Sequence, residues 1–334
     1  MIRRLRICLV LLLSATLGYR CSTAAMKGVV SGFIFDREAS SIRPILGIPG
    51  AATQADAILP GTKLATVAIS SRQDFALAVV AAGNDLIAIT GLRNSVSVRR
   101  IAPGTRPIDT IRLSPRSTAA LVYRRGSNTV QFISGLPGAP RVWNEIEIGH
   151  MPGLVAALAV SDDARLALAA INQQDSAALF LIDRAGNTRP IFSGRRLSAV
   201  SFVSATHHAL ITDDADSKVV WIHDAGSTAA AIPLATSEDG VSRPVGVDAS
   251  PDGRRVFVAN ARPGSVLEID RRTNVATLHP CACSPTGLTP LNDNVMFRLT
   301  ESSAAPLWIF DGSAGQSGIA FVPPPPRAQR GEVR

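Results

Sequence analysis

The chain has 334 residues, enough for one large domain or two ordinary ones. Its formal net charge is +8, but the first 25 residues carry four of these charges and the last 12 contribute a net two more, so about +2 remains for the region between them. Nucleic-acid binding needs a clustered basic face, and single-stranded binding also uses aromatic residues that stack on bases. A near-neutral middle region with an aromatic content of 5% argues against both.

The first 25 residues have the pattern of a secretory signal peptide. A start rich in arginine precedes an apolar run at residues 7–18, and small residues suited to cleavage follow at Thr23 and Ala25. No second long apolar run occurs in the sequence. We therefore expect a secreted or periplasmic protein with no membrane span once residues 1–25 are removed. An uncleaved anchor is the alternative, and a lipid on Cys21 is disfavoured because bulky and charged residues precede it.

From residue 32 onward a short apolar segment that ends in a turn recurs along the chain. The copies are residues 32–37, 86–91, 130–135, 179–184, 219–224, 266–271 and 307–312. Two further apolar strands precede six of the copies, for example at residues 67–81 and 158–171. Since no such pair precedes the first copy, we expect six full units of four antiparallel strands and one N-terminal partial unit without inner strands.

The clearest unit is residues 243–280. Its strands are predicted at residues 245–250, 254–260, 265–273 and 275–280. Residues 251–253 read Pro-Asp-Gly, which suits a tight hairpin turn because proline presets φ and glycine tolerates positive φ. The second strands of the units are apolar almost throughout, as sheets packed on both faces require.

Residues 243–273 resemble the YVTN-type propeller repeat in the stretches SRPVGVDASPDGRRVFVAN and SVLEID. The resemblance extends over residues 29–322 as architecture and is close only over this one unit. It implies a β-propeller of the kind found in secreted and periplasmic bacterial proteins, without implying one activity. With the copies counted above, we predict an all-β propeller of seven blades of four antiparallel strands, the N-terminal blade being incomplete. The propeller domain is placed at residues 27–322, and residues 323–334 form a tail rich in proline and arginine that we expect to be disordered.

Polar loop residues are the candidates for ligand contact, because propellers usually bind ligands at the face that carries the blade-to-blade loops and the loops between second and third strands. The candidates are Arg106, His150, Arg195, Arg243, Asn260 and Arg262. A ring of guanidinium groups at a funnel would bind carboxylate or phosphate. The alternative is that these are solvated loop charges paired with neighbouring aspartates.

A non-catalytic binding scaffold, acting through one face and the central funnel, is the function we favour. Its partner would be a protein or a small anionic ligand. The alternative is a propeller enzyme of the lactonase or quinoprotein type that acts on a small ligand in the funnel. No nucleophile-elbow, metalloprotease or phosphate-loop motif occurs in the sequence, so we predict no catalytic residue, metal or cofactor.

Cys281 and Cys283 are the only cysteines after residue 25. Three interpretations compete: a disulfide across one residue, a soft-metal site with His279, and two small buried hydrophobes. An oxidising compartment and the flanking prolines favour the disulfide. A closed zinc site would be one ligand short.

Overall fold

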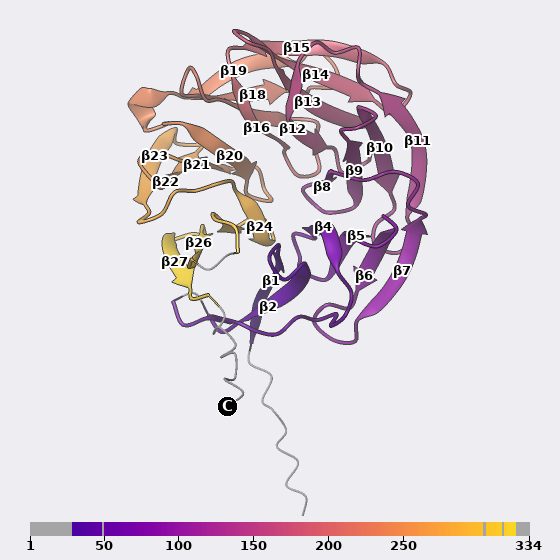
Figure 1. Cartoon of the computed structure of the whole chain (residues 1–334). Coiled ribbons are helices and arrows are strands. Elements are labelled where there is room, and N and C mark those ends of the chain that lie inside the picture. Colours follow the sequence, from indigo (N-terminus) through magenta and orange to yellow (C-terminus); the bar gives the residue numbers. More distant parts are fainter. Residues whose placement is uncertain (1–28, 49, 303–304, 316, 325–334) are drawn as a thin grey trace, which may run out of the picture.

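The computed structural model describes residues 29–48, 50–302, 305–315 and 317–324. The described residues form 27 β strands in seven sheets, arranged around a central channel as the blades of a propeller (Figure 1). Six sheets have four antiparallel strands and the first has three, so the predicted fold with an incomplete N-terminal blade is confirmed. One turn of 3-10 helix, Ser237–Asp239, is the only helix in the described part, and no described helix could cross a membrane. The predicted signal peptide and residues 325–334 of the tail lie outside the described residues.

Each full blade is one continuous stretch of sequence whose strands follow one another from the channel outward. The innermost strands are β4 (Leu64–Ile69), β8 (Thr110–Leu113), β12 (Leu154–Val160), β16 (Leu197–Phe202), β20 (Pro244–Ala249) and β24 (Thr289–Asn292). The second strands are β5 (Phe75–Val80), β9 (Ala119–Arg124), β13 (Leu166–Asn172), β17 (Ala209–Asp213), β21 (Arg255–Asn260) and β25 (Met296–Arg298). The third strands are β6 (Leu86–Thr90), β10 (Thr129–Ser134), β14 (Ala177–Asp183), β18 (Lys218–His223), β22 (Ser265–Asp270) and β26 (Leu307–Asp311). The outer strands are β7 (Ser97–Ala102), β11 (Arg141–Glu147), β15 (Thr188–Gly194), β19 (Ala230–Ala235), β23 (Val275–Pro280) and β27 (Gly318–Val322).

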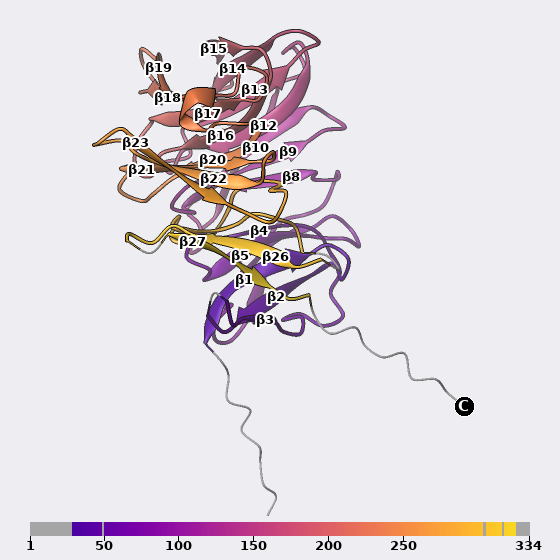
Figure 2. The ribbon, with the colours of Figure 1, turned by 90° about the vertical axis from the view of Figure 1, so that its left-hand side faces the viewer.

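Seven hydrophobic clusters hold the blades together, each of them between two neighbouring sheets. Between the third and fourth blades, for example, Leu121 and Phe132 pack against Val160 and Ala169. The second strands contribute most because they are buried on both faces, as their continuous apolar runs predict. Figure 2 shows the sheets from the side, with β1–β3 and β12–β15 at opposite ends of the view.

A serine begins four of the hairpin turns that join an innermost strand to a second strand. The hydroxyl oxygens of Ser114, Ser161 and Ser250 each accept the backbone N–H five residues later, at 3.0–3.1 Å. Ser70 makes the equivalent contact with Phe75 at 3.2 Å. These turns gather at one end of the channel, called here the hairpin end. The opposite end, where the blade-to-blade loops lie, is called the loop end.

The first sheet consists of β1 (Val30–Asp36), β2 (Ser41–Leu46) and β3 (Thr53–Gln54). The N–H of Phe33, in the first half of β1, donates to Gln73 at the hairpin end. Ser40, just after β1, accepts from the N–H of Leu64 at the start of β4. β1 therefore runs opposite to β4 and has the direction of a second strand.

This direction corrects two expectations about the first blade. Residues 32–37 do not form a third strand; residues 32–36 lie in β1, and β2 has the third-strand direction. Only the innermost strand has no counterpart among the described residues, rather than two inner strands. β1 consequently borders the channel itself (Figure 1). The six other third-strand copies lie in β6, β10, β14, β18, β22 and β26, as predicted.

The first and last blades are joined by side-chain hydrogen bonds as well as by apolar packing. Ile34 and Ile45 of the first blade are buried against Leu307 of the last. Gln54 donates to the carbonyl of Pro323 at 3.3 Å and accepts from the hydroxyl of Ser302 at 3.1 Å. The residues predicted to lie in the partial blade thus take part in closing the ring.

Candidate ligand-binding site

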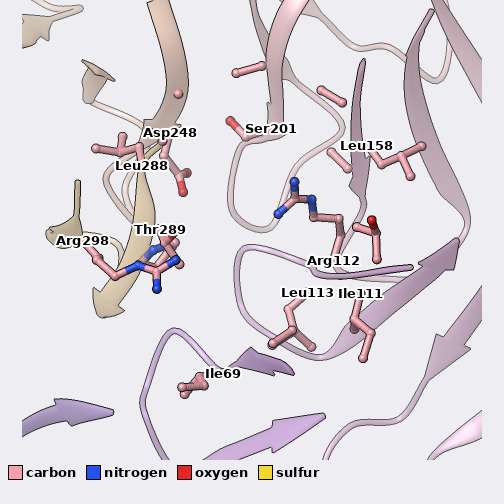
Figure 3. A pocket seen from close by; sticks show the side chains of 18 of the residues that line it. Ile69, Ile111, Arg112, Leu113, Leu158, Ser201, Asp248, Leu288, Thr289 and Arg298 are labelled. Atoms are coloured by element: carbon pink, nitrogen blue, oxygen red, sulfur yellow. The ribbon is translucent and has the colours of Figure 1, made fainter. Parts of the chain in front are cut away.

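The central channel contains a cavity of about 420 Å³, bordered by all seven strands that lie nearest the axis. This volume falls within the range of roughly 300–1,000 Å³ that is usual for small-molecule sites. Most of the wall is small or apolar because it comes from inner strands rich in alanine, serine and valine. The few charged side chains that point into it are therefore the chemically informative part of the wall (Figure 3).

Cross-strand register defines one layer of equivalent positions around the channel. In each full blade, one residue of the innermost strand pairs with a large buried apolar residue of the second strand, from Leu77 in the first such blade to Phe297 in the last. These innermost residues, here called the channel layer, are Ala68, Arg112, Ala159, Ser201, Asp248 and Pro290. Two of the six are charged, with opposite sign.

Arg112 reaches into the cavity from β8 (Figure 3). Its side chain is exposed to the water of the channel, but the channel itself lies inside the protein, with blades all around it. The guanidinium is therefore partly desolvated, and this lowers its pKa. Glu301 opposes the shift and Arg37 adds to it, so both lie within electrostatic range of Arg112. Among the described residues no carboxylate or other acceptor is bonded to the Arg112 guanidinium. Its donors are free for an anion.

A second cationic group, Arg298, points into the same cavity from the end of β25 (Figure 3). It donates to Glu301 at 2.9 Å, and Glu301 also lies 3.4 Å from the Nε of Arg37. Burial lowers the pKa of Arg298, while the neighbouring Glu301 charge opposes that shift. The Glu301 carboxylate is thus shared by two arginines, and it is not bonded to Arg112.

Asp248 faces the cavity from β20 and is 8% exposed (Figure 3). Burial raises the pKa of its carboxyl to about 7, and the charge of Asp162 acts in the same direction. The N–H of Ala249 donates to Oδ1 at 2.8 Å and partly offsets the shift. Asp248 therefore changes protonation near neutral pH, which is unusual for a carboxyl group and typical of functional sites.

Ser201 lies between Ala159 and Asp248 in the channel layer. Its hydroxyl oxygen is buried and has no hydrogen-bond partner among the described residues. Ser201 is one of the residues that line the cavity (Figure 3). An unpaired buried hydroxyl costs free energy, about 1–3 kcal/mol, unless a water or ligand completes its hydrogen bonding.

The loop residues predicted to contact a ligand do not line this cavity. Arg106 bonds to Glu145, and the Nε2 of His150 lies 3.1 Å from the hydroxyl of Thr188 on the outer strand β15. Arg262 is exposed in the turn between β21 and β22.

Two of the other loop candidates come together at an acidic turn between β17 and β18. Arg195 donates to Asp216 at 3.4 Å, and Arg243 lies 4.0 Å from Asp214. Asn260 is buried, where its side chain donates to the carbonyl of Gly240 and accepts from the N–H of Ser242. These contacts hold the loop end in shape, and a ligand role for the loop residues stays a prediction.

Cys281 and Cys283 lie in the loop between β23 and β24 and are joined by a disulfide bond, with their Cα atoms 5.0 Å apart. His279 is not turned toward them, since its Nε2 lies 3.1 Å from Glu268. Across the described part of the chain, no three or more His, Cys, Asp or Glu side chains are grouped in a way that could hold a metal ion.

Sequence reasoning missed Arg112, Arg298 and Asp248. For Arg112 and Asp248 a signal was present: each is a charged residue two positions before the turn serine, where Ala68 and Ala159 stand in other blades. Innermost strands pack some of their residues into the cores between blades, so a charged residue in such a strand is expected at a position that faces the channel. Arg298 had no such signal, because it is the last residue of a second strand only three residues long.

Comparison with known proteins identifies the fold and no family. No protein-family model matches the sequence, and no curated protein is detectably similar to it in sequence. A functionally unknown protein from Desulfotomaculum acetoxidans is similar in structure, with a TM-score of 0.59 at 15% identity over 88% of this chain and 99% of that one.

Two further similar structures have assigned activities. A protein from Bacteroides fragilis, provisionally assigned as a 6-phosphogluconolactonase, has a TM-score of 0.55 at 13% identity over 89% of this chain and 95% of its own. Virginiamycin B lyase from Staphylococcus aureus has a TM-score of 0.52 at 14% identity over 83% of this chain and 86% of its own. At such identities the similarity shows the propeller fold alone.

Proposed function

We propose that the protein is a propeller that binds a small anionic molecule in its central channel. The observation that carries this proposal is Arg112, whose guanidinium points into a 420 Å³ cavity without a bonded acceptor among the described residues. A partly desolvated guanidinium without a partner is unfavourable, and a carboxylate or phosphate would supply two parallel charge-assisted hydrogen bonds. Arg298 adds a second positive charge to the same wall.

The setting of this function is also a proposal. The basic, apolar and small-residue pattern of residues 1–25 supports export to the periplasm or the exterior. The resemblance of residues 243–273 to the YVTN-type repeat supports the same setting, because that repeat is found in secreted and periplasmic bacterial propellers. The ligand would then be a small molecule encountered outside the cytoplasm.

One observation favours catalysis as a second candidate function. Asp248 titrates near neutral pH inside the cavity, which is the property needed in a general acid or base. An enzyme of the lactonase type, acting on a small anionic substrate in the channel, would use it. We rank binding first because Arg112 has a definite chemical complement, whereas the one described hydrogen-bond partner of Asp248 is the backbone N–H of Ala249, which cannot accept a proton from it.

The binding proposal is tested with Arg112→Met, which keeps the apolar stem and removes the charge. Calorimetry with acetate, citrate and phosphate at constant ionic strength should show binding to the wild type and a loss of about tenfold or more in the variant. Arg262→Met is the matched control, because Arg262 is an exposed arginine outside the cavity. Loss of binding in the control alone would instead place the anion at the loop end, and binding by neither protein would overturn the proposal.

A further inference from the structure

Arg112 and Asp248 occupy the same position of the channel layer in two different blades, the third and the sixth of seven. Both side chains point into the one cavity (Figure 3). Within the described residues no ion pair joins them, and the only charge that acts appreciably on Asp248 is that of Asp162. The cavity therefore has a cationic wall and an acidic wall that do not neutralise each other directly.

The channel layer has only small side chains between these two residues. Ala159 and Ser201 are the layer residues of the two intervening blades, and neither reaches far from the wall. Space between the arginine and the acid is thus left open. Ser201 lies beside it on the cavity wall, with its hydroxyl oxygen buried.

Asp248 has acceptor capacity that the protein does not use. The N–H of Ala249 is its only hydrogen-bond partner among the described residues, and it engages Oδ1. The other oxygen is left facing the cavity, where a donor from a bound molecule would pair it. A carboxyl that is nearly buried and half satisfied is costly unless such a partner is present.

We propose that the ligand of the channel is a small molecule with two poles: an anionic group held by Arg112, and a hydroxyl or ammonium group held by Asp248. This inference rests on the proposed function, since it assigns the second end of the molecule that Arg112 binds. It predicts a preference for hydroxy acids and amino acids over simple carboxylates of the same length.

The charged groups around Asp248 set how this preference depends on pH. Its neighbours in the channel layer are Ser201 and Pro290, which do not titrate, and Asp162 lies at the hairpin end. Five further charged residues of the described chain line the same cavity: Arg37, Asp109, Arg112, Arg298 and Glu301. Because burial and Asp162 raise the pKa of Asp248 to about 7, the group is ionised at pH 8 and largely protonated at pH 6. An ammonium pole should accordingly be preferred more strongly at pH 8.

The test uses straight-chain carboxylates of roughly four to six carbons, each with a terminal methyl, hydroxyl or ammonium group. We expect the wild type at pH 8 to bind the ammonium version of the best length about tenfold more tightly than the methyl version, as expected for a charge-assisted hydrogen bond. In Asp248→Asn, which keeps the shape of the side chain, this ratio should fall to about one. Circular dichroism would verify that the variant is folded.

The outcomes separate this inference from the proposed function. If the methyl-terminated carboxylates bind in an Arg112-dependent way and the three versions are equal at every length, the second pole is refuted and anion binding stands. If Asp248→Asn keeps the full ammonium preference at pH 8, the assignment of that pole to Asp248 is refuted. If none of the probes binds to the wild type, both proposals fail together.

Discussion

Arg112 and Asp248 stand at equivalent positions in two blades, carry opposite charge and are not bonded to each other. Their cross-strand partners, Leu121 and Phe257, are both buried core residues, so the two sites have the same register and the same kind of support from the second strand. The repeat has kept its scaffold at this position and varied the group that it presents to the channel.

Replacing Asp248 with asparagine should change how stability depends on pH. The carboxyl has a pKa of about 7 in the folded protein and about 3.9 in the unfolded chain, so the folded state retains a proton that the unfolded chain releases. Wild-type stability therefore falls as pH rises from about 4 to 7, by an amount on the order of 4 kcal/mol at most. Asp248→Asn removes this loss. Thermal denaturation at pH 4.5 and pH 8 should show the variant gaining relative to the wild type only at the higher pH, and a constant difference between the two proteins would contradict the raised pKa.

Asp162 joins three blades at the hairpin end, and its loss should destabilise the protein. Its two carboxylate oxygens accept the N–H groups of Arg116 and Ala205, each at 2.8 Å, from the turns of the neighbouring blades. Asp162→Ala should cost about 1–2 kcal/mol in the free energy of unfolding, because two charge-assisted hydrogen bonds are replaced by bonds to water. Urea denaturation measures this. Asp175→Ala, at an exposed loop residue, is the control and should change little.

Replacing Ala205 with glycine should make the protein more stable. Its φ is +57°, a left-handed conformation that costs a residue with a Cβ about 1 kcal/mol, and its side chain is exposed, so little packing would be lost. We expect Ala205→Gly to raise the unfolding free energy by roughly 0.5–1 kcal/mol in spite of the extra freedom of the unfolded chain. Ala215→Gly, at an exposed alanine with ordinary φ, should lower it by a similar amount. Destabilisation by both changes would show that the turn is not strained.

Gly264 should tolerate no side chain. A Cβ at this position would overlap the carbonyl oxygen of Cys283, and the backbone there is fixed by the bond from the N–H of Cys281 to the carbonyl of Gly264. Gly264→Ala should therefore destabilise the protein by about 1–3 kcal/mol through backbone displacement. Gly126→Ala is the control, because its Cβ would meet no atom within 4 Å. Equal melting temperatures for the two variants would count against the close approach.

The bond between Cys281 and Cys283 is open to direct chemical test. We expect the protein purified without reductant to resist alkylation at both positions until it is reduced, with a mass increase of about two hydrogen atoms on reduction. Because the ring is very small, replacing both cysteines by serine should cost little loop entropy and shift the melting temperature only slightly. Two thiols that react with an alkylating agent before reduction would exclude the disulfide.

The repeat was predictable from sequence because its signal is local and recurs. Six third strands and the turn at residues 251–253 lie where the pattern placed them. Residues 32–37 were assigned to the wrong strand because an apolar run that ends in aspartate is shared by β1 and by third strands such as β22. Local pattern carries no information on strand direction, which here follows from contacts with Gln73 and Leu64.

The candidate site was less accessible to sequence reasoning, because it depends on which residues face the axis. Loop arginines drew attention as the visible charges, although Arg195 and Arg243 prove to lie near carboxylates. Arg112 and Asp248 are each isolated in an apolar strand, and only the register between strands shows that they occupy one layer. A charged residue points to a functional site when its place in the fold keeps it away from the protein surface, where most charged side chains are simply solvated.

The continuity of each blade in sequence has a consequence for how such a protein can diversify. Within the described residues no full sheet borrows a strand from another part of the chain, and each can be copied or exchanged as a unit without cutting a ladder. A duplication would insert a whole blade and one new member of the channel layer at the same time. The width of the channel and the residues that line it would then change by one whole blade at a time, and each duplication would add one side chain to the channel layer.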